Sequence, residues 1–488
     1  MDRLLSEQPA LQWILYTIQT TTFDLVKASY VSLFSLSPRW IAAIIVVTAY
    51  ALYRVKKTNR RVFIDDFAIY HPPKAQMASA QRLYDMIDSV KTYTPANKAF
   101  QAKMLMRSGL GDQTYIPKTF VHGVGLKPAA EEAKQTCTGV LDALFARTGM
   151  KPNDIDFLVV NCSVYCPTPS ITAMIVNHYN MPSKVRTFQI GGMGCSASLI
   201  GVDLINDLLK ANPGKNAVLV STEVTSIDWY YGNDQAFSLQ SALFRLGGAA
   251  MLFSTKKKRG TRYELLHCIR THHGRHDFSH DCIKFDHDDE GYTAIRLSRE
   301  VPKVAGKAIT ENMAKLGEVI LPWTEKARFM ANMIARKHFH SKAKAYTPNF
   351  RKAIDNFCIH TGGRGVIDTV QKNLGLSDKD VEASRATLYR YGNTSSSSVW
   401  YELAYHENQH KMRPGNIVWQ IAFGSGFKAN SCVLKALPGC RLNRHVFDGE
   451  NASFKYSPET CPAPQITVGP EVQAAIDAFK ASQAKKAH

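Results

Sequence analysis

Two parts of this chain repeat one order of elements, and that repetition limits the fold more than any other feature of the sequence. In the first part, a continuous apolar run at residues 154–162 is followed by a loop and a helical pattern at 170–179. In the second part, an apolar run at 354–360 is followed by a glycine turn and a helical pattern at 364–374. Apolar runs that alternate with helices are typical of strands buried in α/β layers.

A further pair of apolar runs, at residues 217–221 and 416–423, extends this correspondence. Two such series predict a duplicated α/β domain with a cleft between its halves. The sequence is therefore divided into an N-terminal region, two halves and a C-terminal tail: residues 1–61, 62–255, 256–440 and 441–488.

The chemically most informative stretch is residues 189–204, QIGGMGCSASLIGVDL. Gly194 allows a sharp turn before Cys195, and the apolar pattern that follows is that of a helix. A cysteine at a helix N-terminus feels the positive end of the dipole, which lowers the pKa of its thiol. Cys195 is therefore a candidate nucleophile for thioester chemistry. The alternative is a buried cysteine at a tight glycine turn.

The second half offers two partners for such a nucleophile. His360 ends an apolar run and precedes a glycine turn, where a side chain can emerge into a cleft. Asn393 follows a strand-like run at 387–391 and precedes four serines at 395–398. Taken singly, the histidine could belong to the core and the asparagine to a turn or cap. With Cys195 they form a Cys-His-Asn set, each member at the end of a strand or turn before a helix.

With these residues the chain resembles the plant-type 3-ketoacyl-CoA synthases, the condensing enzymes of very-long-chain fatty acid elongation. That family belongs to the thiolase-like superfamily, beside the chalcone-synthase-type enzymes. The resemblance spans residues 62–437, and the apolar N-terminal segments are also in the expected place. It rests on motifs in the family's order: GGMGCSA at 191–197, STE at 221–223, WYYGND at 229–234, FRLGGAA at 244–250, RTH at 270–272, CIHTGGRGVID at 358–368 and YGNTSSSSVWYELAY at 391–405.

The resemblance implies a five-layered αβαβα fold in a homodimer, with Cys195 as acyl acceptor and His360 and Asn393 as its catalytic partners. It implies decarboxylative condensation of malonyl-CoA with a long-chain acyl-CoA, giving 3-oxoacyl-CoA, CO2 and CoA without a metal or a redox cofactor. A ketoacyl reductase, a dehydratase and an enoyl reductase are the expected partner enzymes. Residues that contact CoA are not assigned by the motifs.

The chain departs from the family at two positions near the site. Members often carry a histidine four residues before each of the last two catalytic residues, and here those positions are Asn356 and Tyr389. A supporting role for these two residues is therefore in doubt. His272 matches a further family histidine, for which a structural role is expected.

Three alternative functions can be weighed against this resemblance. A soluble chalcone-synthase-like polyketide synthase would use the same three residues, but the apolar N-terminal segments argue against it. A degradative thiolase needs a second catalytic cysteine near the C-terminal glycine turn, which reads GSGFK at 424–428 and has none. An inactive membrane scaffold would not need Cys195, His360 and Asn393 to be intact.

The N-terminal region has the composition of a membrane anchor. Residues 40–55 are almost wholly apolar until Arg54, and residues 11–36 form a weaker candidate that carries Asp24 and Lys27. Each segment could instead be a buried helix, and the first could be one arm of a hairpin or an interfacial helix. The basic run RVKKTNRR begins at Arg54, which places the large C-terminal part in the cytosol.

The net charge of +19 indicates an anionic partner. Nucleic acid is not expected, because no binding motif occurs and aromatic residues are not interleaved with the basic ones. Membrane lipid and phosphate-bearing CoA substrates fit better.

The ten cysteines have no regular spacing, which indicates free thiols in a reducing compartment. Cys162 and Cys166 lack a second ligand pair, and the His- and Asp-rich stretch 267–289 is irregular, so no metal site is predicted.

The chain ends in Lys485-Lys486-Ala487-His488, which resembles the dilysine signal that returns membrane proteins to the endoplasmic reticulum. Such a signal is read only on a free cytosolic tail, and the preceding residues 472–484 are expected to form a helix without a strong apolar face. The sequence therefore predicts an enzyme in the endoplasmic reticulum membrane with its catalytic domain facing the cytosol.

Overall fold

The computed structural model describes residues 40, 42–50, 60–118, 123–227, 229–338, 344–441, 447 and 454–486. The contacts divide the chain into two compact units, Met1–Arg60 and Arg61–His488. In the first unit, residues 40 and 42–50 are helical and exposed. No helix in the described ranges is long and apolar enough to cross a membrane. The predicted segment at 11–36 lies outside those ranges.

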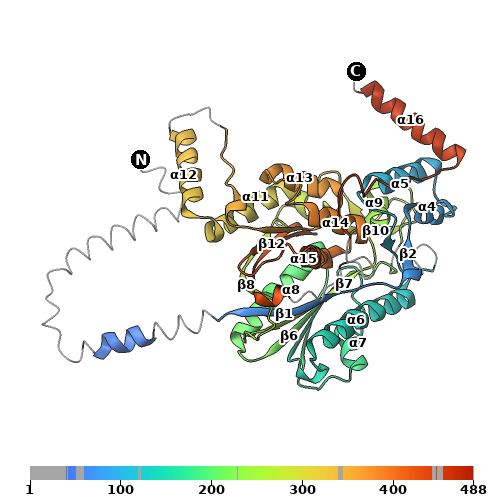
Figure 1. The fold of residues 1–488 in the computed structure, drawn as a ribbon. Coiled ribbons are helices and arrows are strands. Elements are labelled where there is room, and N and C mark those ends of the chain that lie inside the picture. Colours follow the sequence, from blue (N-terminus) through green and yellow to red (C-terminus); the bar gives the residue numbers. More distant parts are fainter. Residues whose placement is uncertain are drawn as a thin grey trace. The chain divides into compact units, whose positions relative to one another are not determined.

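Nine strands of the described chain form one mixed sheet in the second unit, in the order β11-β12-β13-β8-β1-β7-β6-β4-β5 (Figure 1). β4 pairs in parallel with β5 and β6, and β11 pairs in parallel with β12. The bounds are β1 Val62–Ile69, β4 Phe157–Asn161, β5 Arg186–Ile190, β6 Asn216–Thr222, β7 Gly248–Ser254, β8 Tyr263–His272, β11 Asn356–Ile359, β12 Ile417–Gly424 and β13 Lys428–Ala436.

The sheet has two halves that meet at β1. β1 is antiparallel to β7 from Phe63 to Ile69, and it continues into the second half by pairing Val62, Phe63 and Ile64 with β8. The first half therefore consists of β5, β4, β6, β7 and β1, and the second half of β11, β12, β13 and β8.

Helices cover the outer faces of these halves and also fill the space between them. α6 and α7 contact the first half, and α11 contacts the second with α13 packed against it. α8 and α15 lie between the halves, and each contacts strands of both. The described unit thus has the predicted α-β-α-β-α order of layers. The bounds are α6 Leu126–Thr148, α7 Ile171–His178, α8 Ala197–Ala211, α11 Val301–Ile320, α13 Arg364–Leu374 and α15 Ser398–Asn408.

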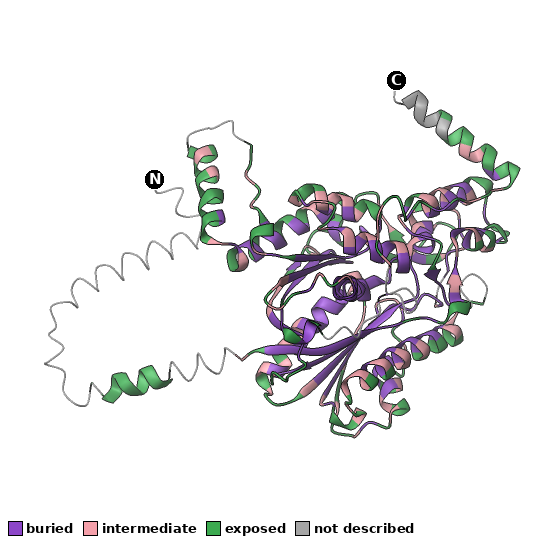
Figure 2. Cartoon of the chain, in the orientation of Figure 1, coloured by how far each residue is buried: buried purple, intermediate pink, exposed green. Residues whose placement is uncertain are grey.

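The middle layer is the centre of the core, as the burial colours of Figure 2 show. Every residue of α15 is buried, including the charged Glu402 and Glu407. Buried charges require partners. The Glu407 carboxylate accepts hydrogen bonds from Arg262 Nη1 at 2.6 Å and from the Tyr263 hydroxyl at 2.7 Å. Glu402 Oε2 accepts from the Ile359 backbone N–H at 2.7 Å, which fixes the end of β11.

The predicted strands at 154–162, 217–221, 354–360 and 416–423 are confirmed as β4, β6, β11 and β12. The helices predicted at 170–179 and 364–374 are confirmed as α7 and α13. The strand-like reading of residues 387–391 is wrong, because they end the helix α14, Glu382–Tyr391. Their aromatic and β-branched side chains favour a strand locally, but packing of α14 against α15 and β11 decides the conformation.

The remaining elements surround this core. A short 3-10 helix at Lys74–Gln76, β2 and α4 follow β1, and the C-terminal helix predicted at 472–484 is part of α16. The bounds are β2 Met77–Ala78, α4 Ala80–Asp88, α5 Pro95–Arg107, β3 Thr114–Tyr115, α9 Gln235–Leu243, α10 Asp277–His280, β9 Ile283–His287, β10 Thr293–Leu297, α12 Trp323–His338 and α16 Pro470–Lys486.

Candidate active site

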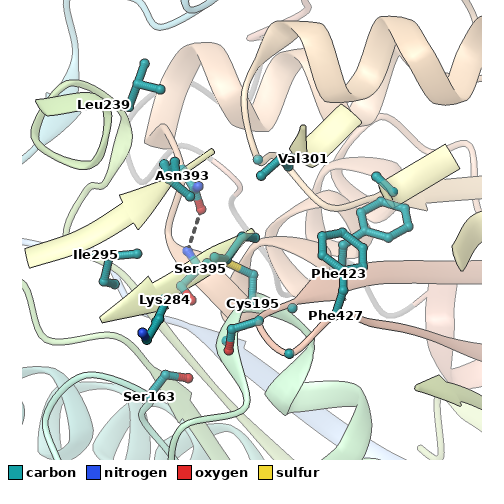
Figure 3. A pocket seen from close by; sticks show the side chains of 18 of the residues that line it. Ser163, Cys195, Leu239, Lys284, Ile295, Val301, Asn393, Ser395, Phe423 and Phe427 are labelled. Atoms are coloured by element: carbon teal, nitrogen blue, oxygen red, sulfur yellow. Dashed lines mark hydrogen bonds between the residues drawn. The ribbon is translucent and has the colours of Figure 1, made fainter. Parts of the chain in front are cut away.

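The predicted Cys-His-Asn set lies around one cavity. A cavity of about 700 Å³ is lined by residues of both halves, and Cys195, His360 and Asn393 are among them. Figure 3 shows Cys195 and Asn393 at its wall. Residues far apart in the chain thus converge on one cavity between the two halves.

Cys195 lies in a tight turn at the start of a central helix. The 3-10 turn Gly194–Ser196 leads directly into α8. Gly194 has a φ of 65°, and a Cβ there would lie 2.6 Å from the backbone nitrogen of Ser425. No other residue fits this position without displacing the 424–428 turn. The close approach binds the Cys195 turn to the second half.

The predicted lowering of the Cys195 pKa is wrong. Burial, with a smaller contribution from the negative charge of Glu223, raises the pKa of the thiol to about 12, although a hydrogen bond with Ser395 opposes the rise. Desolvation disfavours the thiolate more strongly than the helix terminus favours it. The resting side chain is therefore a neutral thiol at neutral pH.

His360 is also neutral. Its backbone N–H donates to the Ile421 carbonyl at 2.9 Å, which continues the β11–β12 pairing to the cavity edge. Its Nδ1 lies 2.8 Å from the hydroxyl oxygen of Ser398, the first residue of α15. Burial lowers the pKa of the imidazole to about 4. Because a serine hydroxyl can donate or accept, Ser398 can support either tautomer of the ring.

Asn393 follows α14 after one glycine. Gly392 has a φ of 71°, and a Cβ there would lie 2.4 Å from Arg245 Cγ. The backbone carbonyl of Asn393 accepts from the Arg245 N–H at 2.9 Å, so the residue is held against the first half. Its side-chain Oδ1 accepts from the Ser395 N–H at 2.8 Å (Figure 3). Since the oxygen is engaged, the Nδ2 hydrogens are the donors that Asn393 can offer to a ligand.

Two further residues at the site were not predicted from the sequence. Glu223 Oε1 accepts from the backbone N–H groups of Ser163 and Val164, each at 2.9 Å. Its Oε2 accepts from the Ser395 hydroxyl at 3.0 Å, and Ser395 in turn hydrogen-bonds with Cys195. Burial raises the pKa of the Glu223 carboxyl. The STE motif and the serine run contained these residues, but no pattern indicated that they meet at Cys195.

The possible supporting residues lie elsewhere. Asn356 Nδ2 is 3.3 Å from His406 Nδ1, and the ring of Tyr389 stacks on Phe454. His272 Nδ1 accepts from the Gly274 N–H at 3.3 Å. None of these three is among the described residues that line the cavity.

The rest of the cavity wall is mainly apolar. It comes from α9, from the β9–β10 hairpin, from the start of α11 and from the 423–427 turn. Lys284 and Arg299 add positive charge. Such a cavity suits an apolar chain attached to an anionic group. The apolar lining residues are Leu239, Leu243, Phe244, Ile283, Phe285, Ile295, Leu297, Val301, Pro302, Ala305, Val366, Phe423 and Phe427.

Comparison with known proteins first shows the fold and the broad family of the chain. Residues 53–338 match the family described as FAE1/Type III polyketide synthase-like protein, and residues 350–436 match the C-terminal domain of 3-oxoacyl-[acyl-carrier-protein] synthase III. Among solved structures, the type III polyketide synthase domain of Steely1 from Dictyostelium has a TM-score of 0.60 at 20% identity, covering 77% of this chain and 99% of that one. PKS-I from Ectocarpus siliculosus has a TM-score of 0.59 at 20% identity, covering 77% and 98%. These structures confirm the thiolase-like fold.

Closer relatives then give the family. The chain is 44% identical to 3-ketoacyl-CoA synthase 9 of Arabidopsis thaliana over 407 residues, which is 81% of this chain and 79% of that protein. It is 44% identical to 3-ketoacyl-CoA synthase 4 of the same plant over 85% of this chain and 80% of the relative. A probable 3-ketoacyl-CoA synthase of Oryza sativa subsp. japonica is 42% identical over 82% and 76%. The chain belongs to the 3-ketoacyl-CoA synthase family, so the resemblance noted in the sequence is confirmed.

Proposed function

We propose that this chain condenses malonyl-CoA with a long-chain acyl-CoA to give 3-oxoacyl-CoA, CO2 and CoA, the first step of very-long-chain fatty acid elongation. One observation carries the proposal: a cysteine, a histidine and an asparagine line one mainly apolar cavity in a member of this family. No metal or redox step is needed for this reaction.

In the first half-reaction, Cys195 Sγ attacks the acyl-CoA carbonyl and the CoA thiolate leaves. Both Cys195 and His360 are neutral at rest. His360 therefore takes the thiol proton during the attack and returns it to the departing CoA sulfur. The acyl chain, now a thioester of Cys195, lies along the apolar wall.

In the second half-reaction, malonyl-CoA loses CO2, and its electron pair passes into an enolate. The enolate oxygen needs hydrogen-bond donors, and the proposed donors are the Asn393 Nδ2 amide and the His360 imidazole N–H. The enolate carbon then attacks the acyl carbonyl, Cys195 leaves as thiolate and is reprotonated, and 3-oxoacyl-CoA is released. Its chemistry calls for reduction, dehydration and a second reduction, which is why a ketoacyl reductase, a dehydratase and an enoyl reductase are the proposed partners.

The test is the mass of the product. The protein is expressed in a host without elongation activity of its own, and membranes are supplied with acyl-CoA and carbon-13 malonyl-CoA. We expect one two-carbon extension per product. A chalcone-synthase-like type III polyketide synthase would instead add several units, and that result would replace the proposal with the alternative.

A homodimer is proposed to form along β5. This strand ends the sheet, and its residues are exposed or partly exposed. Because β5 pairs only with β4 in the described sheet, its outward backbone N–H and C=O groups are available to a second strand. A partner copy paired to this edge would supply hydrogen bonds to them. Light scattering of the detergent-solubilised protein should give a dimer mass, and Phe188→Asp on the same strand should give a monomer. A monomeric unmodified protein would contradict this assembly.

Residues 1–61 are proposed to anchor the enzyme in the membrane, supported by the apolar composition of 40–55 and the basic run after it. Their removal should release much of the protein from membranes, with residual binding through basic surface charge at low salt. If the shortened protein still pellets fully at high salt, residues 1–61 are not the anchor.

The endoplasmic reticulum address is proposed to be Lys485 and Lys486, at the end of α16. Changing both to serine in a tagged full-length protein should shift it away from this organelle by fluorescence imaging. An unchanged location would show that another part of the chain retains the protein there.

A further inference from the structure

The helix α12, Trp323–His338, is unlike the other helices of the second unit. Glu325 is its one buried residue, and five large apolar side chains are exposed. Figure 2 shows the helix almost entirely in the exposed colour. Large apolar side chains gathered on one exposed element mark a contact surface. They are Trp323 at 76%, Phe329 at 43%, Met330 at 47%, Met333 at 42% and Ile334 at 43% exposure.

The face of α12 that packs on the protein is polar. The Glu325 carboxylate accepts hydrogen bonds from Lys352 Nζ at 2.5 Å, the Tyr346 hydroxyl at 2.6 Å and the Asn349 N–H at 3.0 Å. One heptad later, Asn332 Oδ1 accepts from the Tyr346 N–H at 2.9 Å. These contacts fix which side of the helix faces the returning chain.

Three of the five exposed apolar side chains therefore point outward, while Phe329 and Met333 line a hollow beside Tyr346. At 100° per residue, Trp323, Met330 and Ile334 lie on the side of α12 opposite Glu325 and Asn332. An ordinary surface helix has its apolar stripe toward the core and its polar face toward water. α12 has the reverse arrangement, and its inner hydrogen bonds hold the apolar stripe away from the core.

Positive charge accompanies this apolar stripe. Lys326 and Lys337 are exposed and lie next to the stripe around the helix. Arg336 and Arg328 lie nearer the Glu325 side, and Arg328 Nη1 is 3.4 Å from the Glu325 carboxylate. The single acidic residue of the helix, Glu325, points inward, where the hydrogen bond from Lys352, followed by those from Tyr346 and Asn349, lowers its pKa to about 2. The outward side of α12 is thus apolar and cationic, without an exposed carboxylate on the helix to offset the charge.

We propose that α12 docks onto an anionic lipid bilayer as an interfacial helix. A helix lying in the interface buries Trp, Phe and aliphatic side chains at the headgroup boundary, while Lys and Arg reach the phosphates. α12 has both features on its exposed side. This contact is separate from residues 1–61, and no residue of α12 lines the described active-site cavity.

The test uses the full chain reconstituted in phosphatidylcholine vesicles with and without phosphatidylserine. A photoreactive benzoylphenylalanine replaces Ile334 in the apolar stripe or, as a matched control, Ala331 on the flank. Illumination should label phospholipid from position 334 several-fold more than from position 331, and phosphatidylserine should increase the labelling.

A second comparison separates docking from mere proximity to the membrane. With the probe at 334, Trp323→Glu and Met330→Glu together should reduce lipid labelling by roughly tenfold, because two buried apolar contacts are lost. The control pair Thr324→Glu and Ala331→Glu adds the same charge on the flank and should reduce it much less. Condensation in detergent reports folding in every variant, so a failed proposed function and a failed docking proposal remain distinguishable.

Absence of lipid labelling from position 334 in the vesicle-bound protein would overturn the proposal. Labelling of a second copy, or of residues 1–61 of the same chain, would also overturn it and would identify that segment as the occupant. Equal loss of labelling in both double variants would show that only net charge matters and would reject the apolar docking face.

Discussion

The two helices of the middle layer begin in the same way but carry different chemistry. α8 follows the 3-10 turn Gly194–Ser196, and α15 follows the 3-10 turn Ser395–Ser397. The first turn holds Cys195, whereas the second is preceded by Asn393 and places Ser395 against Cys195. The duplicated scaffold thus positions two equivalent helix starts at one cavity. In the proposed mechanism, one presents the nucleophile Cys195, and the other presents Ser395 and Asn393, which orient the nucleophile and bind the second substrate.

Burial also shifts the pKa values of two groups at the site. It raises the pKa of Cys195 to about 12 and lowers that of His360 to about 4, so both groups are neutral near pH 7. The middle layer therefore positions Cys195 and His360 and shields them from water, and it leaves both side chains uncharged. In the proposed mechanism, catalysis therefore begins with a proton transfer between neutral partners as the thioester carbonyl is attacked.

The largest loss of condensation activity is expected from a substitution in the turn before α8. Cys195→Ser should abolish condensation, because a serine hydroxyl at this position lacks the nucleophilicity of the thiol. The control is Cys166→Ser at an exposed cysteine, which should retain activity. Product formation is measured by mass spectrometry, and circular dichroism reports the fold. Normal product from Cys195→Ser would remove the nucleophile from the account.

On the α15 side, Asn393→Ala should lower kcat by roughly 10²–10³, the cost of losing one oxyanion donor. The matched control is Asn356→Ala, because Asn356 is also a buried asparagine of the second half but lies against His406 outside the cavity lining. Steady-state rates with saturating malonyl-CoA provide the comparison. Equal losses in the two variants would mean that Asn393 acts through the fold alone.

The neutral resting state predicts the pH dependence of Cys195 alkylation. Because its pKa is raised above the usual value, the thiolate fraction should grow about tenfold with each pH unit from 7 to 10. The rate of iodoacetamide labelling of the Cys195 peptide should follow without a plateau. His360 stays neutral over this range, since it gains a proton only near pH 4. A plateau below pH 7 would indicate a preformed thiolate–imidazolium pair and would restore the helix-dipole prediction.

The smallest effect on activity is expected from substitutions at Glu402, in the interior of α15. Burial raises the pKa of this carboxyl well above its usual value, which favours its protonated form while it accepts from the Ile359 N–H and the Ser384 hydroxyl. Glu402→Gln keeps a neutral acceptor and should change the unfolding free energy and kcat little. Glu402→Ala removes the acceptor of the Ser384 hydroxyl and leaves the Ile359 N–H with only its 3.1 Å bond to Ser384, and it should cost about 1–3 kcal/mol of stability in denaturant titrations. Equal destabilisation by both would show that Glu402 is ionised.

The sequence allowed the layers and the three cavity residues to be predicted, because strands buried on both sides leave continuous apolar runs and the motifs around Cys195, His360 and Asn393 are distinctive. It did not allow the helix at 387–391 to be predicted, since the conformation of α14 depends on packing against α15.

The electrostatic state of Cys195 could not be predicted either. The glycine turn showed a helix start, but the pKa of the thiol depends on burial by the folded chain, on a hydrogen bond with Ser395 and on the charge of Glu223, and both residues come from other parts of the chain. The outward apolar face of α12 could not be predicted from the sequence either. The residues that fix its inner face lie beyond the helix in the returning chain: Tyr346, Asn349 and Lys352.

The most direct test of the division of labour between the two helix starts is a single-turnover experiment on Asn393→Ala. The variant is incubated with long-chain acyl-CoA, then with malonyl-CoA labelled at its free carboxyl carbon, while the intact protein mass and released CO2 are followed. We predict a stable acyl adduct on Cys195 with little CO2 release, because acylation needs Cys195 and His360 but decarboxylation needs Asn393. An unacylated Cys195 with normal CO2 release would contradict the account and reverse the assignment.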